Sequence, residues 1–178
     1  RRKKNNIKNN TYYINEIKSL NKEIKSVVKN DLKKITSKRK KICGIKFDNP
    51  QIIGVLNVTP DSFSDGGLFL DQSKAYDQTD LMIGSGAKII DIGGESTRPS
   101  SKVVNEKEEW QRIESVIIRL KKNFPKVILS LDTRKSYVMK RGMDCGIDII
   151  NDVSGLNFDK KSFELINSYN IPFILHHM

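Results

Sequence analysis

Five short apolar runs recur along the chain, and each of them leads into polar residues. They are IIGVLNV (52–58), KIIDIGG (88–94), KVILSLD (126–132), DIINDVSG (148–155) and FILHHM (173–178). In the first run β-branched residues are frequent and alternation is slight, as expected of a parallel strand that is covered on both faces. The pattern predicts five strands, each of which delivers a polar loop.

Helical patterns separate these strands. The clearest one covers residues 105–122, where apolar side chains recur every three or four positions. Shorter helices are predicted from Ser73 to about Ser85, near residues 135–143, and after Asp159, which is placed to cap the last one. Strand and helix alternate throughout, which indicates βαβ units and a parallel sheet.

Two architectures have this rhythm, an open doubly wound sheet and a (β/α)8 barrel. The barrel is favoured because every predicted strand ends in polar residues, and a barrel gathers all such ends around one mouth. These residues are Asn57, Asp91, Glu95, Asp132, Asn151, Asp152, His176 and His177. A full barrel needs about 250 residues. We therefore expect a (β/α)8 TIM barrel of which this chain covers about the first five strands, truncated at both ends.

The amino-terminal part differs from the rest, and we expect two domains, residues 1–40 and 41–178. Apolar residues recur at helical spacing over residues 13–35, on a Lys-rich background. That helix could touch nucleic acid or an anionic membrane, but a solvated surface helix is the favoured interpretation. Residues 41–47, KICGIKF, predict a short strand in a hairpin-like plug before the main fold.

Charge supports this division. The net charge of the chain is +11, yet residues 1–45 carry 15 Lys and Arg against three acidic residues, and the remainder is almost neutral. No apolar run approaches 18 residues, so no membrane span is expected. Cys43 and Cys145 make no disulfide framework or metal-ligand spacing, and no secretory signal is visible. We expect a cytoplasmic protein that binds neither nucleic acid nor membrane.

Each polar residue at a strand end also has an ordinary structural explanation. Asp132 could cap the following helix, Asn151 and Asp152 could form Asx turns, and Arg98 could make a surface ion pair. His176 and His177 point to opposite faces of a strand, so at most one of them reaches a site. The coincidence of polar groups at one end of all five strands favours function.

Four sequence motifs of the chain resemble those of a known family. IIGVLNVTPDSFSDGG, IIDIGGESTRP, LSLDT and IINDVSG resemble, in order and spacing, the motifs of the dihydropteroate synthases, folate-pathway enzymes of the pterin-binding barrel superfamily. The resemblance covers roughly residues 42–178. It implies a transferase that joins 4-aminobenzoate to 6-hydroxymethyl-7,8-dihydropterin diphosphate with Mg2+, releases pyrophosphate, forms a homodimer and is a sulfonamide target.

The resemblance also implies site residues. Asn57 would bind the metal and the diphosphate, and Asp132 and Asn151 would bind the pterin ring with Asp91 beside them, as the catalytic group. The two long loops would close over the diphosphate and shape the aminobenzoate pocket. The substrate-binding residues implied there are Asp61, Phe63 and Asp65 in the first loop, Thr97, Arg98 and Pro99 in the second, and His176 at the last strand.

The sequence departs from the family pattern in three respects. Ser100 stands where Gly is usual, His176 replaces an apolar residue, and the family's later Asp, Lys and Arg-x-His would lie beyond residue 178. We therefore expect the fragment alone to be inactive. The alternatives are a methyltetrahydrofolate:corrinoid methyltransferase, which would bind a pterin without a diphosphate loop, and a noncatalytic basic binding module.

Overall fold

The computed structural model describes residues 13–38, 41–59, 67–96 and 103–176, with the backbone alone for residues 67–72. Among these residues, no helix combines the length and the apolar character that crossing a membrane requires.

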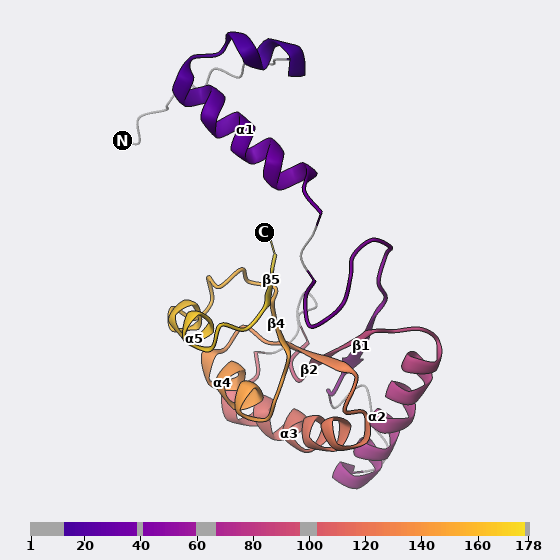
Figure 1. Ribbon diagram of the computed structural model, residues 1–178. Helices are drawn as coiled ribbons and strands as arrows, with labels where there is room; N and C mark the ends of the chain where they lie inside the picture. The colour runs from indigo at the N-terminus through magenta and orange to yellow at the C-terminus, as the bar shows by residue number, and fades with distance from the viewer. Residues whose placement is uncertain (1–12, 39–40, 60–66, 97–102, 177–178) are drawn as a thin grey trace. The chain divides into compact units, whose positions relative to one another are not determined.

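The chain divides into two compact units, Arg1–Lys40 and Lys41–Met178. The first contains a 3-10 helix, η1 (Ile14–Ser19), and an α-helix, α1 (Lys22–Thr36) (Figure 1). The predicted helix is thus interrupted before Asn21, whose side-chain oxygen lies 2.9 Å from the third backbone nitrogen of α1 and caps it. An Asn that satisfies its own backbone in this way favours a helix start over a helix interior.

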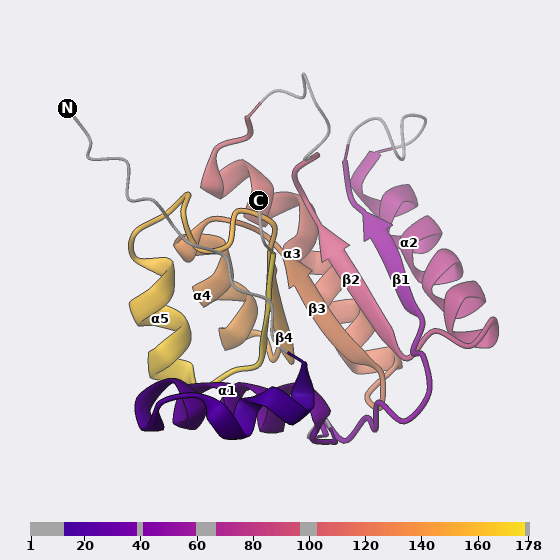
Figure 2. The same cartoon turned by 90° about the horizontal axis from the view of Figure 1, so that it is seen from above.

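The second unit is a five-stranded parallel sheet with helices between its strands (Figure 1). The elements are β1 (Ile53–Asn57), α2 (Gly67–Gly84), β2 (Ile89–Gly93), α3 (Glu106–Asn123), β3 (Ile128–Asp132), α4 (Ser136–Asp144), β4 (Ile149–Asp152), α5 (Ser162–Tyr169) and β5 (Phe173–Leu175). Each strand pairs with the one before it, and α2 to α5 follow one face of the sheet (Figure 2). The predicted alternation of strands and helices is confirmed.

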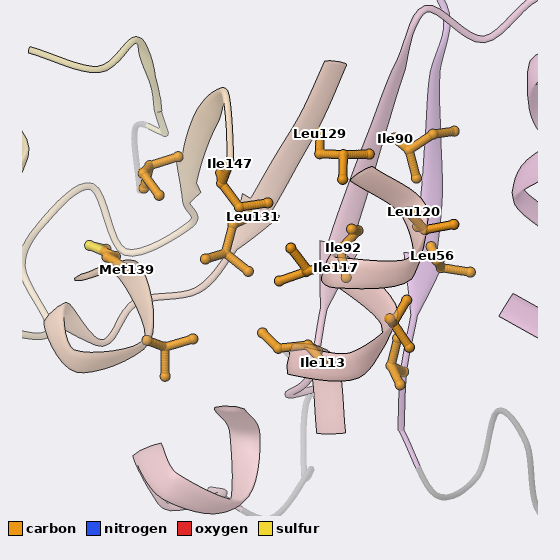
Figure 3. Close-up of a cluster of buried hydrophobic side chains, with 14 of the residues drawn as sticks. Leu56, Ile90, Ile92, Ile113, Ile117, Leu120, Leu129, Leu131, Met139 and Ile147 are labelled. Carbon is orange, nitrogen blue, oxygen red and sulfur yellow. The ribbon is translucent and has the colours of Figure 1, made fainter. Parts of the chain in front are cut away.

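The core lies between the sheet and these helices. Alternate residues of the strands point toward the helices and are buried against the apolar stripe of α3 (Figure 3). The fully buried members of this layer include Leu56, Ile90, Ile92, Leu129, Leu131 and Ile150 from the strands and Ile113, Ile117 and Leu120 from α3. Each such side chain stabilises the fold by about 1.5–3 kcal/mol relative to exposure. This layer fixes which residues face the opposite side of the sheet.

The strands differ in how completely they are covered. β2 and β4 are buried at every position. β1 alternates between exposed and buried residues, and Ile53 and Val55 are 42% and 55% exposed. The prediction that β1 is covered on both faces is wrong for this structure, because β1 packs with one face toward the helices, against α2, and the described residues leave its other face exposed.

Three local predictions need correction. Residues 41–47 form no strand; one antiparallel bridge joins Ile42 and Ile45, with Cys43 and Gly44 at φ of 48° and 81°. Two consecutive left-handed residues turn the chain back before a strand can extend. Helix α2 begins at Gly67 rather than Ser73.

Asp159 is not the cap of the last helix that the sequence predicts, but it binds two helix ends. It does not occupy the N-cap of α5, a position that belongs to Lys161. Its Oδ1 accepts a hydrogen bond from the Lys161 backbone (3.0 Å), and its Oδ2 accepts one from the Ser136 backbone at the start of α4 (2.9 Å). Asp159 therefore satisfies free backbone N–H groups of two helix ends at once.

The strongest helix begins and ends as its sequence predicts. The Asn105 side chain accepts a hydrogen bond from the Glu108 backbone at 2.9 Å and caps α3. Acidic residues occupy the first turn and Lys121 and Lys122 the last, which suits the helix dipole. Helix α3 also brings Glu109, in its first turn, next to Gly94 after β2 and Lys135 after β3.

Candidate functional site

Four residues at the carboxyl ends of neighbouring strands lie in one row across the sheet. Asn57 is in register with Gly93, Gly93 with Asp132, and Asp132 with Asn151. Their side chains share the face opposite the helices because strand residues alternate in direction. Gly93 leaves a gap, since a Cβ atom there would lie 3.5 Å from Asn57 Oδ1 and 3.6 Å from Asp132 Oδ2. An amide and a carboxylate thus converge across a glycine.

A hydrogen-bonded chain continues from this row. Asn151 Nδ2 donates to Asp91 Oδ2 at 2.9 Å, and His176 Nε2 lies 3.0 Å from Asn151 Oδ1. Because the Asn151 amide nitrogen donates to Asp91, the Asn151 amide oxygen faces the imidazole, and His176 donates to this oxygen from Nε2. The arrangement holds the Asn151 amide in one orientation. Of the two adjacent histidines, of which the sequence predicts that at most one reaches the site, His176 contacts Asn151.

Asp91 is a second carboxylate in this site, one layer below Asp132. It pairs in register with Val55 and Ser130, and it is 7% exposed. Its Oδ1 is buried and has no hydrogen-bond partner among the residues that the structure describes. A buried acceptor without a partner costs free energy, so this atom is suited to a ligand that brings a donor.

Asp132 is the carboxyl group whose ionisation is most altered. Burial, followed by the negative charges of Asp91, Glu109, Asp152 and Glu95, raises its pKa from 3.8 to about 7. Desolvation and like charges both disfavour a carboxylate. Near neutral pH, Asp132 can therefore hold or release a proton, and a bound cation or an N–H donor would favour its ionised form.

The same acidic surroundings bear on metal binding. No three His, Cys, Asp or Glu side chains within the described part of the chain are placed to hold a metal. Asn57 Oδ1 is a neutral oxygen ligand of the kind that Mg2+ accepts, and Mg2+ usually keeps waters or substrate phosphates as most of its ligands. The residues present therefore fit a hard cation that is bound jointly with a phosphate.

A group of four charged residues lies beside this site, and the sequence analysis singled out only one of them, Glu95. Glu95 follows β2, Arg134 and Lys135 follow β3, and Glu109 lies on α3. Burial by itself raises the pKa of Glu95, but hydrogen bonds from Arg134, from the Val104 backbone and from Lys135 hold it below its usual value. For Arg134 and Lys135 the sequence signal was their place directly after LSLDT.

The remaining residues that the sequence predicts at the site either lie within the described part of the chain or fall outside it. Asp152 forms the predicted turn, since its carboxylate accepts hydrogen bonds from the backbone of Ser154 (2.8 Å) and Leu156 (3.0 Å). The structure brings together Asn57, Asp91, Asp132, Asn151 and His176. The predicted loop residues Asp61, Phe63, Asp65, Thr97, Arg98 and Pro99, with Ser100 and His177, lie outside the described residues.

Comparison with known proteins gives a consistent result. The sequence family described as pterin binding enzyme matches residues 53–178. The dihydropteroate synthase of Streptococcus pyogenes serotype M1 is 45% identical over 129 residues, which are 72% of this chain and 48% of the relative. The chain thus spans about half the length of the curated relatives it matches.

Solved structures of dihydropteroate synthases are also similar to this chain. The dihydropteroate synthase of Xanthomonas albilineans with 4-aminobenzoic acid superposes with a TM-score of 0.72 at 38% identity, over 80% of this chain and 52% of that one. The enzyme of Anaplasma phagocytophilum with bound 6-hydroxymethylpterin-monophosphate gives 0.65 at 36% identity, over 72% and 49%.

Proposed function

The chain belongs to the family of pterin binding enzymes, and from this premise we propose that the full-length protein is a dihydropteroate synthase. It would condense 4-aminobenzoate with 6-hydroxymethyl-7,8-dihydropterin diphosphate to give 7,8-dihydropteroate and pyrophosphate. The observation that carries this proposal is the row of Asn57, Asp132 and Asn151 across Gly93, with Asp91 hydrogen-bonded to Asn151. This row suits a flat ring with alternating donors and acceptors.

The pterin ring is assigned to Asp132 and Asn151. A pterin presents adjacent N–H donors, which a carboxylate accepts in pairs, and an amide can serve both its donors and its acceptors. The unpartnered Asp91 Oδ1 supports this assignment because a buried acceptor gains from a ligand N–H. The raised pKa of Asp132 gives a further reason, since such donors would compensate its burial.

The diphosphate and Mg2+ are assigned to Asn57. When bound, Mg2+ would neutralise the negative charge that develops on the leaving diphosphate. Asn57 would hold it through Oδ1, beside the acidic site of Asp91 and Asp132. The two loops would complete this end of the site, with Asp61, Phe63, Asp65, Thr97, Arg98 and Pro99 around the diphosphate and the aminobenzoate.

The chemistry needs no protein nucleophile. The C–O bond between the pterin methylene and the diphosphate breaks, a C–N bond to the amine of aminobenzoate forms, and the amine loses a proton. If cleavage of the C–O bond runs ahead, positive charge develops on the pterin, and the carboxylates of Asp91 and Asp132 stabilise it. His176 would fix Asn151 in the orientation that the pterin requires.

Location and assembly are also proposals. We place the enzyme in the cytoplasm and expect a homodimer, as the family resemblance implies. We expect it to bind neither nucleic acid nor membrane.

The test uses the full-length protein. Pyrophosphate release is expected to require both substrates and Mg2+, and calorimetry is expected to detect binding of the dihydropterin diphosphate in preference to methyltetrahydrofolate. Asp132→Asn should weaken pterin binding about 10- to 100-fold, because a hydrogen bond to a charged group contributes about 1.5–3 kcal/mol. Asp144→Asn, an exposed carboxylate on α4, is the matched control and should bind normally.

The competing functions give other results. Preferential binding of methyltetrahydrofolate, with no pyrophosphate release, would favour the methyltransferase. Tight nucleic-acid binding that is lost on deletion of residues 1–40, in a protein without turnover, would favour the basic binding module.

A further inference from the structure

Glu95 connects the two ends of the loop that joins β2 to α3. Its Oε1 accepts a hydrogen bond from the Val104 backbone at 3.0 Å, across nine residues, and its side chain is 5% exposed. The neighbouring Gly94 carbonyl accepts a hydrogen bond from Arg112 Nη1 on α3 at 2.9 Å. The two ends of this loop are therefore hydrogen-bonded to each other and to α3.

Two cations from the next strand hold the same carboxylate. Arg134 binds it in a bidentate manner, with Nε 3.0 Å from Oε2 and Nη2 3.2 Å from Oε1. Lys135 Nζ lies 3.0 Å from Glu95 Oε2 and also donates to Glu109 Oε2 on α3. The Arg134 guanidinium lies 4.1 Å from the ring centre of Phe158, in the segment after β4. Segments following three strands are thus joined.

The charged side chains of Lys135 and Glu109 are unusually well buried. The side chain of Lys135 is 7% exposed and that of Glu109 is fully buried. A buried ion pair is commonly no more stabilising than apolar residues of the same size, because desolvation offsets the attraction. What these contacts do provide is direction, since the bidentate contact of Arg134 with Glu95 tolerates few geometries. Lys135 ties the same carboxylate to Glu109 on α3. The charges are therefore better explained by the geometry they impose than by stability.

We propose that Glu95 and Lys135 are positioning residues. They fix the stem of the β2–α3 loop, which we define as its two ends at Glu95 and Val104, against the β3–α4 loop beside Asp132. Lys135 follows Asp132 by three residues, and Glu95 begins the segment that carries Thr97 and Arg98. Through this stem the two residues set the affinity for the second substrate. The identity of that substrate, 4-aminobenzoate, rests on the proposed function, whereas the stem contact does not.

The kinetic test compares Lys135→Met and Glu95→Gln with the wild-type full-length protein. The KM for 4-aminobenzoate is expected to rise on the order of tenfold, because small misplacements of a binding group cost this much or more. The KM for the dihydropterin diphosphate should change far less. A purely structural role would instead reduce the folded, active fraction and leave both KM values unchanged.

The matched control is Lys121→Met. Lys121 Nζ lies 2.6 Å from Asp148 Oδ2 and is partly buried, but this ion pair is at the opposite, amino-terminal end of the strands. The control is expected to lower the melting temperature without changing either KM. If Lys135→Met folds poorly, the double variant Lys135→Met/Glu109→Gln is used in its place, because it removes one charge of each sign.

A second measurement does not depend on turnover. Amide hydrogen exchange at Val104 should accelerate in Glu95→Ala and remain slow in Lys121→Met, because only the first change removes the acceptor. Selective loss of aminobenzoate affinity together with faster Val104 exchange would support the proposal. Unchanged exchange, or KM values that respond as in the control, would overturn it. A wild-type protein without pyrophosphate release would refute the proposed function alone, and Val104 exchange would then decide the stem contact.

Discussion

Asp132 links the chemistry of the site to the stability of the fold. Its pKa is about 7 in the folded chain, whereas an unfolded chain ionises Asp near 3.9. Between these values the folded state binds more protons than the unfolded state. The free energy of unfolding therefore falls as the pH rises from about 4 to 7, and the loss is complete above the folded pKa.

Asp132→Asn should remove this fall in the free energy of unfolding, because an amide side chain does not ionise. In protein free of ligands and divalent cations, we expect the variant to be more stable than the wild type by up to about 4 kcal/mol at pH 8, and by much less at pH 4. Urea denaturation at both pH values measures the difference. The same variant should bind the pterin more weakly, a combination that a residue serving stability alone would not give.

Asp144→Asn is the control for this prediction. Hydrogen bonds from Lys140 and Tyr169 lower the pKa of the exposed Asp144, so its contribution to stability has the opposite sign and is lost as the pH falls. A stabilisation of Asp132→Asn that did not grow between pH 4 and pH 8 would contradict the assigned pKa.

Much of the site at the residue scale could be predicted from the sequence. Asn57, Asp132 and Asn151 each end an apolar run, and parallel strands bring such ends to one edge. The partners of Glu95 could not be predicted in this way. Arg134 Nε and Glu95 Oε2 lie 3.0 Å apart although 39 residues separate them, and only the register of β2 with β3 reveals the pair.

At the level of elements, Gly94 allows α3 to approach the end of β2. A Cβ atom at this position would lie 2.9 Å from the Glu109 carbonyl oxygen and 3.0 Å from Ile113 Cγ2. The first of these is backbone, so the helix itself would have to move. The two glycines of the sequence IIDIGG thus have different uses, since Gly93 opens the site and Gly94 closes the packing behind it.

Gly94→Ala should therefore destabilise the protein by about 1–3 kcal/mol, as expected for overpacking in a close-packed interior. Because Glu109 moves with α3, the aminobenzoate KM should also rise. Gly84→Ala at the exposed end of α2 is the control, since a Cβ atom there meets nothing within 4 Å; it should be neutral or stabilising by about 0.5–1 kcal/mol. Equal urea midpoints for the two variants would contradict this account of α3 packing.

The elements that the sequence predicted best were those with a strong apolar period. Helix α3, predicted over residues 105–122, is observed as Glu106–Asn123. The errors fall where local backbone chemistry overrides the period. Asn21 divides the amino-terminal helix, and Cys43 and Gly44 turn a sequence with strand propensity back on itself.

At the scale of the whole molecule, the five strands that the structure describes form an open sheet with two edges rather than a closed barrel. β1 and β5 each have one strand neighbour, and the face opposite the helices exposes Ile53 and Val55 of β1. In a closed (β/α)8 barrel, side chains from further strands cover such positions. Exposed apolar side chains on β1 and strand edges without a neighbour are features that promote association with other chains.

We therefore expect the 178-residue chain, expressed alone, to release no pyrophosphate from the two substrates and to self-associate. The row of Asn57, Asp132 and Asn151 forms one side of the mouth, and the chain spans about half the length of its curated relatives. The comparison is with the full-length protein under the same conditions, with light scattering to follow association. Turnover by a monomeric 178-residue chain, dependent on both substrates, would show that these strands suffice to hold the pterin and the diphosphate. In that case the residues described here would constitute the catalytic unit without the remaining strands of a barrel.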